Sequence, residues 1–249
     1  MFPILFETSW LTIYSYPLFI GLAWGFGYQA SKTYLIKNEV SLKGFPLLFW
    51  GNFVLTWIGA KLFFLIYSVG EDEFVRYAGS SLFWLGGGFV FYGGLIFGLG
   101  FTLFYTLVFK KFPIDKVYLF LAPLCFAHAI GRIGCLMAGC CFGTVCDYPW
   151  GIHHLDDVRH PVQLYEAIFL VVLGYLLTRL IQKEFKIRFI VSTYFIGYSV
   201  IRFILEFFRG DVVRGVHYLG LSTSQYISIV LAIAFALYLA LASKKESGA

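Results

Sequence analysis

Apolar residues run in long, nearly uninterrupted stretches along the chain, and short segments between them carry most of the charges. A helix needs about 20 apolar residues to cross the hydrocarbon core of a bilayer. The alternation of apolar and polar residues that a membrane β-barrel requires is not evident. The pattern therefore predicts an all-α integral membrane protein with seven transmembrane helices, at residues 14–31, 46–68, 82–109, 117–137, 163–178, 189–206 and 221–242.

The pattern also indicates a single polytopic membrane domain over residues 1–249, without a long linker, a soluble domain or an internal repeat. The longest polar interval is residues 139–162, for which we expect a small extracytoplasmic loop or cap. The opening MFPILFETSW lacks a basic segment and reaches Glu7 early. We therefore expect the first span itself, and not a cleaved signal peptide, to direct insertion.

Composition supports the membrane class. The chain is 59% hydrophobic and only 13% charged, whereas a soluble domain averages about 25% charged residues. The net charge of +5 requires no nucleic acid partner, because cytoplasmic loops that face anionic lipid carry such an excess.

The loop charges orient the predicted spans. Along the chain, alternate segments outside the spans carry 0, 3, 1, 3, 1, 4, 2 and 2 Lys and Arg residues, so one side has twelve and the other four. Cytoplasmic loops carry the excess of basic residues. The amino terminus is therefore predicted to lie outside and the carboxyl terminus in the cytoplasm.

Five charged residues remain in or near the spans: Lys61, Arg132, Glu166, Arg202 and Glu206. Such residues cost several kcal/mol in lipid, so they usually face an interior cavity or a charged partner.

One stripe of these residues falls on a single helix face. Tyr198, Arg202, Glu206 and Arg209 follow one another at intervals of four, four and three, which is the spacing of one helical face. Glu206 can neutralise Arg202, but the stripe then keeps an excess positive charge.

A second arginine lies at another span end. Arg132 stands between Gly131 and Gly134, which allow a backbone or a ligand to approach closely. Arginine binds phosphate oxygens with two parallel hydrogen bonds. Arg132 and Arg202 therefore indicate a cavity for an anionic head group, and the alternative is a structural brace between helices.

Four cysteines, Cys135, Cys140, Cys141 and Cys146, lie within twelve residues at the outer side, whereas Cys125 lies deeper and is expected to pack in the core. In an oxidising compartment the first expectation is one or two disulfides. A catalytic thiol is the second. Zinc is the weakest, because no C-x₂-C pair is present.

Six stretches, in order along most of the chain, match one family: YSYPLF, GAKLFFLIY, GGGFVFYGGL, GRIGCLMAGCCFG, RHPVQLYEA and YSVIRFILEFFRGD. Together they resemble the prolipoprotein diacylglyceryl transferases of bacteria. These seven-span enzymes of the cytoplasmic (inner) membrane transfer a diacylglyceryl group from phosphatidylglycerol to the lipobox cysteine of a prolipoprotein. The resemblance implies this fold, this activity, these partners and this location.

The resemblance also assigns residues. The family's essential arginine falls on Arg202 and its critical first-span tyrosine on Tyr16, while Lys61 replaces an arginine. The predicted catalytic residues are Arg202, Arg132, Tyr16, Tyr92 and Cys135. The predicted substrate-binding residues are Arg132, Gly134, Gly143, His160, Gln163, Glu166, Tyr198, Arg202, Glu206 and Lys61. No cofactor and no metal are expected.

The chain departs from the family at polar positions. Cys135 and Ala138 replace the two asparagines of the family signature, and Cys140 replaces its glutamate. Tyr92 replaces a histidine that is proposed as the family's general base. A chain that keeps the phosphate arginines but replaces these polar positions is a divergent relative, so the resemblance supports the lipid pocket more strongly than the reaction.

The reaction requires a base for the acceptor thiol, a cationic group for the leaving phosphate and exclusion of water. Arg132 and Arg202 suit the second task, and the candidates for the base are Tyr92, His160 and Glu166. Two alternatives are a phospholipid-dependent transferase with another acceptor and a non-enzymatic lipid-binding or transport protein.

The topology is directly testable. A reporter fused after Lys245 should be cytoplasmic, and a reporter inserted near Asp156 should be external, because of the loop charges. If both reporters lie on one side of the membrane, the seven-span topology is wrong.

Overall fold

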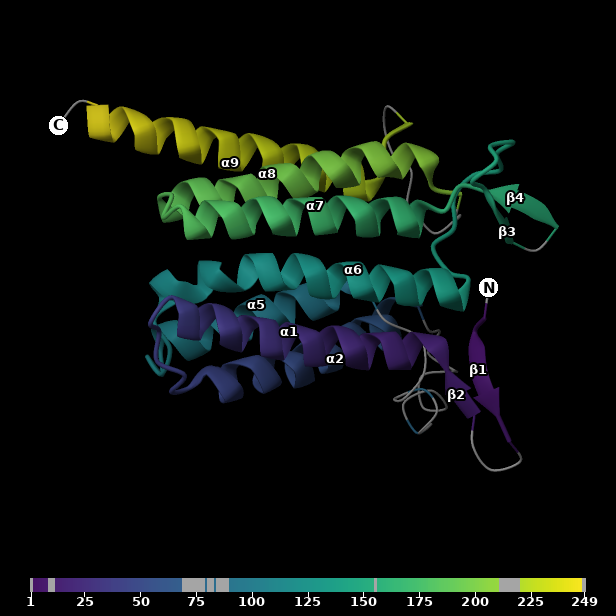
Figure 1. Cartoon of the computed structure of the whole chain (residues 1–249), viewed down its shortest axis with the longest axis horizontal. Coiled ribbons are helices and arrows are strands. Elements are labelled where there is room, and N and C mark those ends of the chain that lie inside the picture. Colours follow the sequence, from purple (N-terminus) through teal and green to yellow (C-terminus); the bar gives the residue numbers. More distant parts are fainter. Residues whose placement is uncertain are drawn as a thin grey trace. The chain divides into compact units, whose positions relative to one another are not determined.

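The computed structural model describes residues 2–8, 12–68, 79, 83, 90–154, 156–210 and 220–247. Figure 1 shows long helices accompanied by two short hairpins. The elements are β1 (Ile4–Glu7), β2 (Thr12–Tyr14), α1 (Ser15–Lys37), α2 (Phe45–Ser68), α5 (Phe91–Leu107), η1 (Ile114–Phe120), α6 (Leu121–Ala138), β3 (Ile152–His154), β4 (Asp157–Arg159), α7 (Val162–Gln182), α8 (Ile187–Leu205), η2 (Glu206–Phe208) and α9 (Thr223–Ser247).

The helical membrane class agrees with the prediction, but the count of seven spans is not established. Within the described residues, five helical segments are long and apolar enough to cross a membrane: Phe45–Ile66, Ile114–Ala138, Val162–Gln182, Ile187–Phe208 and Thr223–Ala242.

The two remaining predicted spans correspond to α1 and α5. Helix α1 has 23 residues but polar side chains in its second half, including Gln29 and Lys32, and it is not among the five. Helix α5 is apolar but has only 17 residues, and most of residues 82–90 of that predicted span lie outside the described residues.

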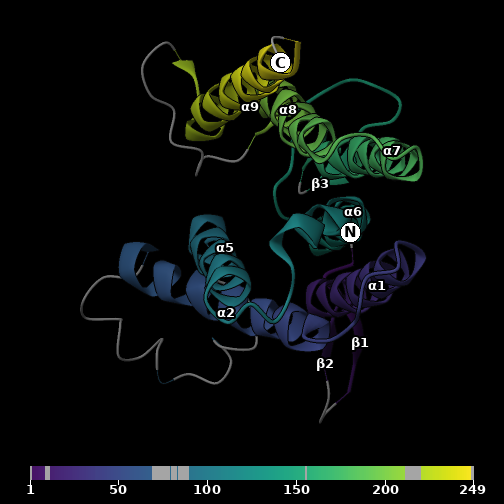
Figure 2. The same ribbon diagram turned by 90° about the vertical axis from the view of Figure 1, so that its left-hand side faces the viewer.

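The chain divides into two compact units, Lys32–Val117 and the remainder. In the first unit, α2 and α5 lie side by side (Figure 2). Gly59 and Gly93 face each other there, and a methyl group on either would overlap the backbone carbonyl of the other. Asn52 Nδ2 donates to Thr102 Oγ1 at 2.9 Å, which joins the same two helices.

Lys61 is fully buried within this unit. Its ammonium donates to the carbonyl of Phe83 at 2.5 Å and lies 4.4 Å from the centroid of the Phe83 ring. These contacts satisfy a buried cation locally, and the assignment of Lys61 to lipid binding stays a prediction.

The other unit contains Met1–Ser31 and Tyr118–Ala249. Helices α6, α7, α8 and α9 follow one another as packed neighbours, and Figure 2 shows α7, α8 and α9 side by side. The close contacts use glycine: Gly174 of α7 faces Cys125 and Phe126 of α6, and Gly197 of α8 faces Leu173 of α7.

Residues 139–162 are folded against the end of α8. Strands β3 and β4 pair antiparallel, and Thr144 donates its backbone N–H to Phe208 at 2.8 Å. Gly210 contacts the backbone of Gly143 so closely that a side chain at Gly210 would overlap it. The loop after α6 is therefore held next to the helix that carries Arg202.

Candidate functional site

The carboxylate of Glu166 on α7 is the centre of a buried polar cluster. Glu166 is only 1% exposed. Its Oε1 lies 2.9 Å from Arg132 Nη2, accepts a hydrogen bond from Tyr198 at 3.3 Å and lies 3.8 Å from His128 Nε2. Its Oε2 lies 3.9 Å from Arg202 Nη1. Side chains of α6, α7 and α8 thus meet at one carboxylate.

Arg202 joins this carboxylate to a second one. Its Nη2 lies 2.7 Å from Oε2 of Glu206, one turn further along the chain, and 3.3 Å from the Ser224 hydroxyl of α9. Glu206 is 2% exposed. The predicted Arg202–Glu206 pair is present, and it is one half of a larger ion-pair network.

The charges of this network do not cancel. Arg209 lies within electrostatic range of Glu166, as do Arg132 and Arg202, and Arg202 also pairs with Glu206. Among the described residues this leaves one positive charge, which matches the charge of one phosphodiester.

Two buried donors in the network are unused. Arg132 Nε and Arg202 Nη1 have no hydrogen-bond acceptor among the described residues. A buried donor without a partner costs about 1–3 kcal/mol, and more when it is charged. An anion with several oxygens, such as a phosphate, would satisfy both donors. The geometry therefore fits a phosphate site as well as a structural brace between helices.

His128 belongs to the cluster and was not among the predicted site residues. Its ring centroid lies 5.6 Å from that of Tyr198, in addition to its contact with Glu166. The sequence carries one signal for it: His128, Arg132 and Cys135 follow at intervals of four and three, which places them on one face of α6.

Tyr16, the second residue of α1, lies within electrostatic range of Arg132 and of the thiols of Cys135, Cys140 and Cys141. The structure therefore brings this predicted residue towards the end of α6. Tyr92 is in α5 of the other unit, and its side chain lies outside the described residues.

The two predicted glycines allow close packing. A Cβ on Gly134 would lie 2.6 Å from Cβ of Phe19 in α1, and a Cβ on Gly143 would lie 2.6 Å from Cβ of His160. The close approach expected at Gly134 is thus made by helix α1. A part for Gly134 and Gly143 in lipid binding stays a prediction.

Gln163 and His160 support the loop after α6. The amide nitrogen of Gln163, which is 1% exposed, donates to the carbonyl of Cys140 at 2.6 Å. His160 Nδ1 lies 3.3 Å from the Tyr165 hydroxyl, and its ring contacts those of Tyr148 and Phe208. His160 therefore belongs to an aromatic group at the base of this loop.

All five cysteines are free thiols in the structure. The sulfur atoms of Cys135, Cys140 and Cys141 lie within 4.8 Å of one another. Cys146 is not in this group and donates its backbone N–H to Val158 of β4. Cys125 is fully buried against α7, in agreement with its predicted packing role.

The two loop thiols differ in acidity. Hydrogen bonding with the thiols of Cys135 and Cys140, aided by the charges of Arg132 and Arg209, holds the pKa of the Cys141 thiol below its usual range. Hydrogen bonding with Cys135 and Cys141 raises the pKa of Cys140.

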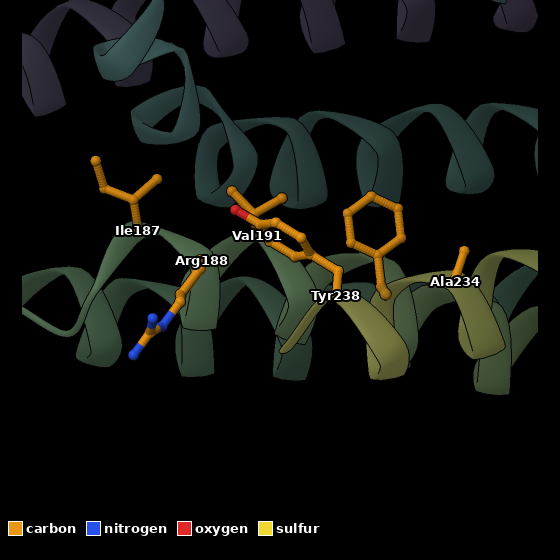
Figure 3. Close-up of a pocket in the computed structure, with 6 residues that line it drawn as sticks. Ile187, Arg188, Val191, Ala234 and Tyr238 are labelled. Carbon is orange, nitrogen blue, oxygen red and sulfur yellow. The ribbon is translucent and has the colours of Figure 1, made fainter. Parts of the chain in front are cut away.

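A hollow lies elsewhere on the same unit (Figure 3). It is lined by Ile187, Arg188, Val191, Ala234, Phe235 and Tyr238 of α8 and α9. Arg188 precedes Arg202 by fourteen residues on α8, about 21 Å along the helix axis. The hollow is thus separate from the charged cluster.

Comparison with known proteins decides the family. The sequence model of the prolipoprotein diacylglyceryl transferases matches residues 3–241. The chain belongs to this family. The predicted membership is confirmed, and with it a transferase class for the chain.

Two clostridial relatives extend this match. The phosphatidylglycerol–prolipoprotein diacylglyceryl transferase of Clostridium tetani is 32% identical, with 92% of this chain and 93% of the relative covered. A Clostridium perfringens enzyme of the same name is 33% identical, with 92% and 91% covered. The enzyme of Pasteurella multocida is 36% identical over 57% of this chain and 53% of its own length.

The central role of Glu166 gives a stability prediction. Glu166→Gln removes the charge that Arg132 faces, and an uncompensated buried charge costs about 3–5 kcal/mol. The variant should unfold at a lower temperature than the wild type in detergent micelles. The exposed Glu184→Gln is the matched control and should unfold like the wild type. Equal unfolding temperatures for Glu166→Gln and the control would contradict the central role.

Proposed function

We propose that this protein transfers a diacylglyceryl group from phosphatidylglycerol to the lipobox cysteine of a prolipoprotein and releases glycerol-1-phosphate. The observation that carries the proposal is the pair of partly buried arginines, Arg132 on α6 and Arg202 on α8, each with a buried, unused donor atom beside Glu166. The names of the two clostridial relatives support the same reaction.

The place of action follows from the charges and the relatives. The relatives are bacterial enzymes, and the described part of the chain carries five helices that are long and apolar enough to span a membrane. With the basic residues on the inner side, the protein acts in the cytoplasmic membrane, with its amino terminus outside and its carboxyl terminus in the cytoplasm.

In this proposal the guanidinium groups bind the phosphodiester of the donor lipid. The excess of one positive charge attracts the lipid head group, and each planar guanidinium group can donate two parallel hydrogen bonds to the phosphate oxygens. Charge grows on the leaving phosphate as the carbon–oxygen bond breaks, and fixed cations in a dry site stabilise that charge. Glu166 and Glu206 hold the two arginines in position, and Tyr16 and Tyr198 add hydroxyl groups.

The acceptor thiol must lose its proton before its sulfur attacks the glyceryl carbon. We assign this proton transfer to His128, whose imidazole lies beside Glu166 and is in contact with Tyr198. The new bond joins the cysteine sulfur to that carbon, the carbon–oxygen bond to phosphate breaks, and the thiol proton moves to His128. The three bases expected from the sequence are less suitable. Glu166 already binds Arg132 and accepts a hydrogen bond from Tyr198, and His160 lies among aromatic rings. The side chain of Tyr92 lies outside the described residues.

A second candidate is the same lipid-dependent transfer to another acceptor. It is favoured by the replacement of three polar signature positions by Cys135, Ala138 and Cys140. A lipobox peptide that stays unmodified, while labelled glycerol-1-phosphate is still released with another thiol acceptor, would identify this alternative.

Conservative replacement of the arginines tests the phosphate site. Arg132→Lys and Arg202→Lys keep the charge but lose the two-pronged hydrogen bond. Each charge-assisted hydrogen bond contributes about 1.5–3 kcal/mol, so transfer should fall about ten- to a hundredfold.

The measurement is transfer of labelled diacylglyceryl to a lipobox peptide by protein in lipid nanodiscs. Arg188→Lys, in the separate hollow, is the matched control and should keep full activity. Wild-type turnover by folded Arg132→Lys and Arg202→Lys would show that both residues are only braces.

The pH profile tests His128. His128→Gln should lower transfer at pH 7 by about 10²–10⁴-fold, the usual contribution of a general base. The loss should shrink as the pH rises through about 8.5, because the acceptor thiol then ionises without help. The exposed His153→Gln serves as the control. A loss of the same size at every pH would assign His128 a positioning role instead.

A further inference from the structure

Three thiols lie together at the end of α6, and the proposed transfer reaction uses none of them as a nucleophile, because its thiol arrives on the acceptor. The sulfur atoms of Cys135, Cys140 and Cys141 lie within 4.8 Å of one another, and each offers one ligand atom. We propose that these three residues form a thiolate site for a thiophilic metal ion, Zn²⁺ or Cu⁺. The site goes beyond the proposed function, which needs no metal.

The local backbone brings the sulfurs together. Helix α6 ends at Ala138, and Gly139 follows in the left-handed region at φ 73°. Cys140 then donates its backbone N–H to the Cys135 carbonyl at 3.1 Å. Cys141 also adopts positive φ, at 61°, which is uncommon for a residue with a side chain. The two left-handed residues turn the chain back over Cys135.

The spacing suits a metal ion. A thiolate sulfur lies about 2.3 Å from Zn²⁺, so three sulfurs around one ion are about 3.8–4.0 Å apart. The three sulfurs already meet within 4.8 Å, and a shift of less than about 1 Å per pair closes the site. Soft thiolate ligands select Zn²⁺ and Cu⁺ over magnesium or calcium.

The surroundings offset the charge of such a site. Three thiolates and one Zn²⁺ carry a net charge of −1. Arg132 and Arg209 lie within electrostatic range of Cys141, and these cations lower the free-energy cost of gathering negative charge there. The buried amide of Gln163 holds the Cys140 carbonyl at 2.6 Å, which fixes the loop that supplies two of the ligands.

The site also has an entry path. Cys135 is buried at the helix end, Cys141 is partly exposed and Cys140 is exposed. An ion can therefore bind Cys140 at the surface before the other two sulfurs complete the coordination.

The number of sulfurs favours a metal over a disulfide. A disulfide would use two of the three thiols and leave the third beside it. The fourth outer cysteine, Cys146, lies next to Gly151 and β4 and is not in the group. A metal ion uses all three sulfurs in one site.

Cadmium titration tests the proposal. The full-length protein is purified in nanodiscs, reduced, treated with a chelator and titrated with Cd²⁺, whose thiolate complexes absorb in the ultraviolet. We expect one Cd²⁺ per chain, displaced by Zn²⁺ or by Cu⁺, and the ion that displaces it at lower free concentration identifies the preferred metal.

Single substitutions locate the ligands. Cys135→Ala, Cys140→Ala and Cys141→Ala should each weaken Cd²⁺ binding by more than about tenfold, since loss of an outer-shell partner alone costs that much. Cys125→Ala and Cys146→Ala are matched controls and should bind Cd²⁺ like the wild type. Circular dichroism checks that each variant is folded.

Three results would overturn the proposal. The first is a wild-type protein that binds no stoichiometric Cd²⁺ while its thiols remain reactive. The second is unchanged binding by the three alanine variants. The third is a disulfide within the group, found by peptide mapping of protein extracted from membranes without reductant. These readouts do not depend on transferase activity, so they stand apart from the test of the proposed function.

Discussion

The buried carboxylate of Glu166 is the constraint on which the site depends. A charge that is 1% exposed persists only with close partners, because desolvation of a carboxylate costs several kcal/mol. Arg132 at 2.9 Å, Tyr198 at 3.3 Å and Arg202 at 3.9 Å come from the two helices that flank α7. Sliding either helix by one residue along its axis, about 1.5 Å, would break these contacts, so Glu166 fixes the register of α6, α7 and α8.

The proposed phosphate site and the thiol group share one end of one helix. Arg132 and Cys135 are three residues apart on α6 and therefore lie on the same face. Gln163 comes from the first turn of α7, three residues before Glu166, and it holds the loop that carries Cys140. A displacement of the cysteine loop would therefore act on the arginines through both α6 and α7.

Local sequence patterns predicted local features and missed those made across helices. The Arg202–Glu206 pair follows from a spacing of four, and the membrane class follows from composition. Glu166 has no such neighbour in sequence, so its contacts with Arg132 and Tyr198 become visible only when three helices pack. The cysteine spacing ranked a metal site last, because the prediction did not include the left-handed turns at Gly139 and Cys141, next to which three sulfurs lie together.

The Arg132–Glu166 contact also bears on how the protein enters the membrane. Either residue alone on a lipid-exposed helix costs free energy during insertion, up to about 2.5–3.5 kcal/mol at the helix centre and less towards its ends. Helices α6 and α7 are consecutive and packed together, so each supplies the counter-charge that the other needs. Insertion of the two helices as a pair therefore neutralises both charges, whereas insertion of either helix alone leaves one charge exposed to lipid.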